Sequence, residues 1–102
     1  MTARQNRAAT YPDQATAQWA TQQVVTSNEQ MIHRWLAQST RQRLTVEAAW
    51  PSRREPVGRV MLQAMMLASR DSLDVRAARV TLKRSDESPH GFVVHSTFPI
   101  YL

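Results

Sequence analysis

Three consecutive residues near the end of the chain carry side chains suited to moving protons. His95, Ser96 and Thr97 place an imidazole beside two hydroxyls. Histidine is the side chain whose proton exchanges near neutral pH, and neighbouring cations could hold a phosphate. This combination of groups suits phosphodiester chemistry. One histidine in a strand is a weak signal by itself, because such residues more often simply face solvent or a neighbour.

These residues fall in the second strand of a predicted β-hairpin. Apolar and polar residues alternate over Ala78–Arg84, which predicts a half-buried first strand. Residues 85–91 are typical of a surface turn, and the second strand is expected over Phe92–Phe98, because Pro99 cannot donate to a strand ladder. The period of two puts Phe92, Val94, Ser96 and Phe98 on one face, and Val93, His95 and Thr97 on the other.

The candidate site residues follow from this hairpin. The candidate catalytic residues are His95, Ser96 and Thr97, and the candidate substrate-binding residues are Lys83, Arg79 and Arg84. His95 and Ser96 alternate, so both can point into one site only if the strand bulges. His33, His90 and His95 have no metal-ligand spacing, and the chain has only two glycines, so we expect no metal site, no dinucleotide fingerprint and no cofactor.

Composition restricts the class of protein. A chain of 102 residues with 42% hydrophobic content predicts a single folded domain over residues 1–102. The absence of cysteine removes disulfides and thiolate chemistry. We expect no membrane segment, and any export signal would lie outside this chain. The net charge of +5 favours anionic partners, either nucleic acid or an acidic protein.

The order of the predicted elements indicates an α+β fold. Asp13 is placed to cap a helix over residues 14–25, and Ser27 with Gln30 has the spacing of a capping box for a second helix ending near Gln38. Alternation over residues 43–50 predicts a strand, whereas residues 61–69 fit either a helix or a strand. The expected architecture is two N-terminal helices packed on a curved, mainly antiparallel sheet.

Several segments, in order, resemble a known family. They are Thr10–Ala17, Asn28–Leu36, Pro56–Arg59, Ala78–Arg84 and Gly91–Pro99. Over roughly residues 10–99 the chain is similar to the bacterial ribonuclease A-like toxin domain, found at the C-termini of contact-dependent growth inhibition proteins and other polymorphic toxins. The resemblance implies a pancreatic ribonuclease-like fold without disulfides and metal-independent RNA cleavage by transfer to the 2′-hydroxyl. It also implies a cognate immunity protein, which we expect to be acidic, and delivery within a larger effector to the target-cell cytoplasm.

The chain departs from the family pattern in two places. Family members usually carry a helix with a catalytic histidine ahead of the Thr-Tyr-Pro-Asp region, and this chain begins too late to contain it, so residues 1–10 are expected to be flexible or a remnant of that helix. The family's closing Thr-x-Tyr-Pro is here Ser96-Thr97-Phe98-Pro99. Ser96 keeps a hydroxyl and Phe98 loses one, while the Val94-His95 pair resembles the final strand of pancreatic-type ribonucleases.

Two functions therefore remain open. The first is an RNA-cleaving toxin domain, in which the candidate hairpin residues line the active site. The second is a non-catalytic basic module that binds RNA or an immunity protein without cleavage. A single imidazole cannot readily act as both acid and base, so we expect cleavage by this chain alone to be weak or absent.

Overall fold

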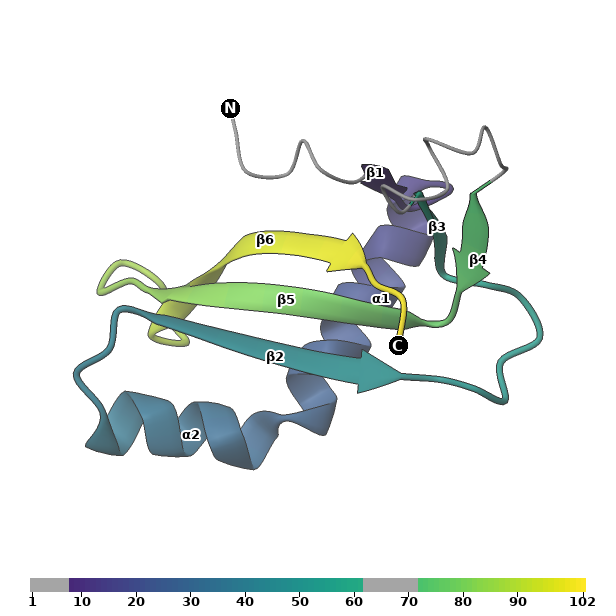
Figure 1. Ribbon diagram of the computed structural model, residues 1–102. Helices are drawn as coiled ribbons and strands as arrows, with labels where there is room; N and C mark the ends of the chain where they lie inside the picture. Colours follow the sequence, from purple (N-terminus) through teal and green to yellow (C-terminus); the bar gives the residue numbers. More distant parts are fainter. Residues whose placement is uncertain (1–7, 62–71) are drawn as a thin grey trace.

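The computed structural model describes residues 8–61 and 72–102, which form two helices and two antiparallel sheets (Figure 1). One sheet has the strand order β1-β3-β4 and the other β2-β5-β6. The elements are β1 (Ala8–Thr10), α1 (Gln14–Ser27), α2 (Glu29–Gln38), β2 (Arg43–Ala49), β3 (Gly58–Met61), β4 (Leu73–Val75), β5 (Ala77–Arg84) and β6 (Phe92–Pro99). The predicted α+β class is confirmed, with the strands divided between two sheets.

Helix α1 begins where the sequence predicts. Asp13 is its N-cap, and the carboxylate Oδ1 accepts a hydrogen bond from the Thr16 backbone N–H at 2.7 Å. Hydrogen bonding from Thr16 holds the pKa of Asp13 below its usual value of 3.8. A carboxyl whose pKa is lowered by folding stabilises the fold above its unfolded pKa, and this contribution is lost as pH falls through the folded value.

The junction between the helices differs from the predicted capping box. Ser27 is the last residue of α1, and Asn28 separates the two helices. The Asn28 side-chain amide donates to the Val24 carbonyl at 2.7 Å and to the Glu47 carbonyl at 3.0 Å. Asn28 therefore satisfies an orphan carbonyl at the end of α1 and joins that end to β2.

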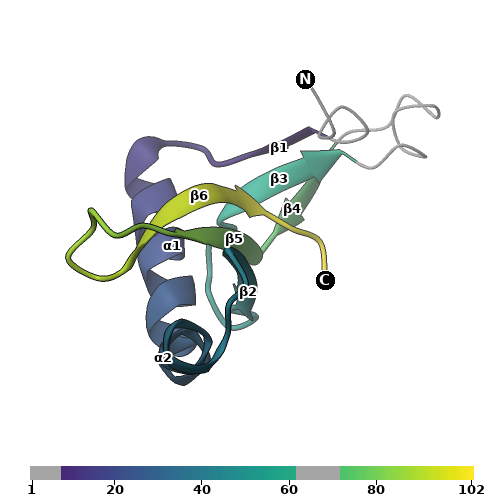
Figure 2. The ribbon, with the colours of Figure 1, turned by 90° about the vertical axis from the view of Figure 1, so that its left-hand side faces the viewer.

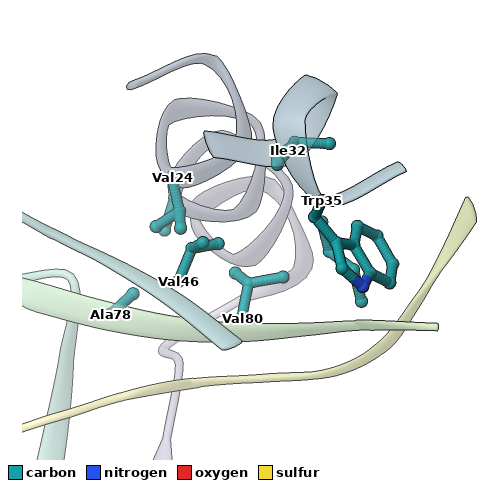
Figure 3. Close-up of a cluster of buried hydrophobic side chains, with 8 residues drawn as sticks. Val24, Ile32, Trp35, Val46, Ala78 and Val80 are labelled. Carbon is teal, nitrogen blue, oxygen red and sulfur yellow. The ribbon is translucent and has the colours of Figure 1, made fainter. Parts of the chain in front are cut away.

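The main core lies between the helices and the β2-β5-β6 sheet. Its buried residues are Ala20, Val24, Ile32, Trp35, Val46, Ala78, Val80 and Leu82 (Figure 3). Trp35 is buried, and its indole N–H donates to the Arg41 carbonyl at 2.9 Å. On β2 and β5 the inward residues have even numbers, so the odd-numbered residues point to the face opposite α1.

The second sheet overturns one expectation about the N-terminus. Ala8–Thr10 were expected to be flexible or a helix remnant, but they pair as β1 with β3. Their partner lies about fifty positions away in the sequence, so local pattern gives no signal for the pairing. Figure 2 shows this sheet at the end of the molecule away from α2. Of the ambiguous segment 61–69, Met61 ends β3 and the remainder lies outside the described residues.

Candidate active site

A bulge in β6 determines which side chains reach each face of the sheet. Val94 pairs with Leu82 and Ser96 pairs with Thr81, so His95 between them has no partner on β5. The predicted alternation is therefore wrong beyond Val94. Thr97, paired with the buried Val80, turns toward α1, and Ser96 turns to the opposite face.

The face opposite α1 carries a set of polar side chains arranged in cross-strand rows. One row pairs Arg43 with Lys83, the next aligns Thr45, Thr81 and Ser96, and the third pairs Glu47 with Arg79. We call these seven residues the polar sheet face; it is the side without α1, which runs behind the sheet in Figure 1. His95 adjoins it, at the bulge between the first two rows.

Charges on the polar sheet face are unevenly balanced. Arg79 Nε donates to Glu47 Oε2 at 2.6 Å, and both side chains are about one-third exposed. The other two cations, Arg43 and Lys83, are exposed and stand directly opposite each other. Like charges in a cross-strand pair repel, so an anion bound between them would relieve that repulsion. The hydroxyls of Thr45 and Thr81, 3.0 Å apart, supply hydrogen-bonding groups in the next row.

The predicted site residues divide between the two faces of the sheet. Ser96, Lys83 and Arg79 belong to the polar sheet face, and exposed His95 adjoins it. Thr97 lies on the α1 side, where its hydroxyl is 2.7 Å from that of Tyr11 and 2.8 Å from that of Thr21. The candidates therefore do not form one continuous row.

Arg84 lies on the inner side and is engaged by the end of α2. Its guanidinium donates to the Arg41 carbonyl at 2.9 Å, the Trp35 carbonyl at 2.7 Å and the Leu36 carbonyl at 3.4 Å, and also to the Ser39 carbonyl. It stacks over the Trp35 ring, 5.1 Å from the centroid. These contacts satisfy orphan carbonyls at a helix C-terminus and favour a structural role over phosphate binding.

Replacing Arg84 with alanine should therefore affect stability more than RNA binding. Loss of charge-assisted bonds to half-buried carbonyls predicts that the free energy of unfolding falls by about 2 kcal/mol. Urea denaturation followed by tryptophan fluorescence measures this change. RNA affinity measured well below the unfolding midpoint should stay within about twofold of the original; a larger loss of affinity with unchanged stability would show that Arg84 contacts phosphate instead.

A groove lies on the α1 side of the sheet, between both helices and the hairpin. Its volume is about 720 Å³, and its lining residues are Ala17, Gln18, Thr21, Gln22, Val25, Thr26, Glu29, Ile32, His33, Leu36, His90, Phe92, Val94 and Thr97. We call it the helix groove. His33 and His90 are exposed and contribute to its walls. Among the described residues its lining contains neither lysine nor arginine, so the helix groove is less suited to phosphate than the polar sheet face.

Sequence reasoning missed part of both surfaces. The sequence predicts a strand that contains Arg43 and Thr45. Their odd numbers place them on the same face as Lys83 and Thr81, but only once β2 is known to pair with β5. The hydroxyl contacts of Tyr11 and Thr21 have no comparable local signal. Among the described residues, no three His, Cys, Asp or Glu side chains gather as a metal site, and no helix has the length and apolarity to span a membrane.

Comparisons with known proteins identify the family. A sequence model described as "Bacterial CdiA-CT RNAse A domain" matches residues 1–99. No curated protein gives a significant match. The structure is similar to the crystal structure of a CdiA-CT/CdiI complex from Y. kristensenii 33638, with a TM-score of 0.81, 21% identity, and coverage of 94% of this chain and 79% of that one. That likeness shows a common fold. Because the family match extends over nearly the whole sequence, the chain belongs to the bacterial CdiA-CT RNase A domain family.

Proposed function

We propose that this chain is a toxin domain that cleaves RNA at the polar sheet face. The observation that carries the proposal is the strand register, which sets Arg43, Lys83 and Ser96 on one surface with His95 at its edge. Membership of the CdiA-CT RNase A domain family supports the same reaction class.

The reaction is transfer of the phosphodiester phosphorus to the 2′-oxygen. The 2′-oxygen loses its proton to a base and bonds to phosphorus, while the bond from phosphorus to the 5′-oxygen breaks and that oxygen takes up a proton. The products are a 2′,3′-cyclic phosphate and a 5′-hydroxyl. We assign one of the two proton transfers to His95, and stabilisation of the charge on the phosphoryl oxygens to Arg43 and Lys83.

Lys83 provides a direct test of the binding surface. Lys83→Ala should weaken binding of single-stranded RNA and lower the magnitude of the salt slope, d log K/d log[salt], by about one, because one phosphate contact is lost. Fluorescence anisotropy with a labelled oligonucleotide at several salt concentrations measures both quantities. Arg34→Ala, an exposed cation on α2 outside the polar sheet face, is the matched control. Equal effects of the two substitutions would point to general charge attraction.

The proposed partners include a cognate immunity protein. The similar solved structure is a CdiA-CT/CdiI complex, and the basic charge of this chain favours an acidic partner. We place the domain within a larger effector that is delivered to the cytoplasm of a target bacterium during competition between bacteria. Covering the polar sheet face would neutralise such a domain directly.

Incubation of the purified chain with total RNA in EDTA tests the function. The expected products are fragments with a 5′-hydroxyl and a 2′,3′-cyclic phosphate, detected because their 3′ ends resist labelling by ligation until the cyclic phosphate is removed. Intact RNA, both with this chain and with a version extended at its N-terminus, would contradict the assignment.

A binding module without catalysis is the second candidate. One observation favours it. Among the described histidines, His33 and His90 line the helix groove, and only His95 adjoins the polar sheet face. A single imidazole cannot readily act as both acid and base. In that case RNA or protein binding should survive His95→Ala but weaken with salt and with loss of Arg43 or Lys83.

A further inference from the structure

Three hydroxyl groups from distant parts of the chain meet beneath the bulge of β6. Thr97 Oγ1 lies 2.7 Å from Tyr11 Oη and 2.8 Å from Thr21 Oγ1. All three side chains are partly buried, and burial raises the pKa of Tyr11 above its usual value, so the phenol stays protonated; in each hydroxyl pair either oxygen can be the donor. We call these residues the hydroxyl cluster. It fastens the last strand both to the segment before α1 and to α1 itself.

The hydroxyl cluster depends on the register shift. Without the bulge, the period of two would turn Thr97 to the outer face and bring Ser96 inward. The extra residue at His95 instead sends Thr97 toward Tyr11 and Thr21, and Ser96 toward Thr81. A one-residue shift of this kind moves every later side chain of the strand to the other face.

A competing register is chemically plausible for this sequence. Ser96 also carries a hydroxyl, which the straight register would offer to Tyr11 and Thr21 in place of that of Thr97. The straight register would also move Pro99, which is buried against Gly58 in the bulged strand. The residue at position 97 therefore contributes to the difference in free energy between the two registers.

We propose that the hydroxyl cluster holds β6 in the bulged register and so positions Ser96 and His95 beside the cations of the polar sheet face. Tyr11, Thr21 and Thr97 are then positioning residues, since none of them belongs to the polar sheet face. The consequence for cleavage rests on the proposed function, whereas the consequence for the register does not.

The three variants Thr97→Val, Thr97→Ser and Tyr11→Phe test the proposal. Valine keeps the shape of threonine but removes the hydroxyl, serine restores the hydroxyl, and Tyr11→Phe removes one partner alone. Thr26→Val is the control, because its hydroxyl lies in the helix groove but bonds Gln22 on the helix surface. The register is measured by NMR from cross-strand contacts of Ser96 with Thr81 and of Thr97 with Val80. The kcat and KM for RNA cleavage are measured separately, below the unfolding midpoint of each variant.

The expected result is specific to kcat. Thr97→Val should shift the cross-strand contacts and lower kcat about 10- to 100-fold, because a misplaced proton-transfer group slows the chemical step. KM should change little, since Arg43 and Lys83 remain on β2 and β5. Tyr11→Phe should act in the same direction more weakly, and Thr97→Ser should restore both readouts.

Two outcomes test the proposal separately from the proposed function. Variants that only lose stability, with the bulged register and kcat intact, would overturn the positioning role and leave a structural one. If the parent chain does not cleave RNA, the NMR contacts alone decide: a shifted register in Thr97→Val that Thr97→Ser reverses supports the proposal, and an unchanged register overturns it.

Discussion

Replacing His95 with alanine is expected to lower the rate of RNA cleavage by at least about 100-fold. A positioned acid or base contributes roughly 10²- to 10⁴-fold to such reactions, and His95 is the imidazole beside the polar sheet face. Its exposure and its place at a bulge, without a cross-strand partner, mean that the substitution should leave the fold intact. Initial rates on a fluorogenic oligonucleotide in EDTA measure the effect.

The other two histidines provide matched controls. His33→Ala and His90→Ala each remove an exposed imidazole from the helix groove, on the other side of the sheet. Both variants should retain cleavage within about twofold. If either lost cleavage while His95→Ala retained it, the active site would have to be moved to the helix groove.

Replacing Gly58 with alanine is expected to destabilise the fold strongly. A Cβ atom there would lie 2.4 Å from Pro99 Cγ, 2.7 Å from Pro99 Cβ and 2.6 Å from the Thr10 carbonyl oxygen. Ring and backbone atoms cannot swing aside, so β1, β3 and the end of β6 would have to separate. Overpacking of this kind predicts a loss of about 3 kcal/mol in the free energy of unfolding, measured by urea denaturation.

Gly91 is the appropriate comparison. Among the described residues, a Cβ there would meet only the Leu36 methyl groups, at 3.6 and 3.7 Å. Its φ of +88° still disfavours alanine, at a cost of about 1 to 2 kcal/mol. The two substitutions thus separate steric exclusion from backbone strain. A loss at Gly58 no larger than that at Gly91 would show that the strands adjust around the methyl group.

Local sequence signals predicted most elements of the fold. The Asp13 cap, the alternation over Ala78–Arg84 and the turn over residues 85–91 each act within a few neighbours, and each is confirmed. The strand Ala8–Thr10 was not predictable in this way, because its stability comes from pairing with β3 rather than from its own pattern. The Asn28 side chain likewise finds one of its partners, the Glu47 carbonyl, on a distant strand.

The candidate site was less predictable because it depends on one register shift. Alternation correctly assigned Arg79 and Lys83 to one face, and the same parity already separated Arg84 from them. Beyond Val94 the period of two gave the wrong faces, because β6 contains a bulge that its residue types do not predict. Tertiary contacts of Thr97 to Tyr11 and Thr21 accompany this bulge. How the residues divide between the faces is therefore a tertiary property, while their chemical types are visible in the sequence.

The hydroxyl cluster also has a consequence for the order of folding. The β5–β6 hairpin closes over a turn of seven residues, whereas the Tyr11–Thr97 contact spans 86 positions of the chain. Closure of a longer loop costs more chain entropy, so distant contacts are generally made after nearby ones. Pairing of β6 with β5 would accordingly precede the contacts that join Thr97 to Tyr11 and Thr21. Under the proposed function, a refolding chain would therefore carry the cations of β5 before His95 and Ser96 are held in their final positions.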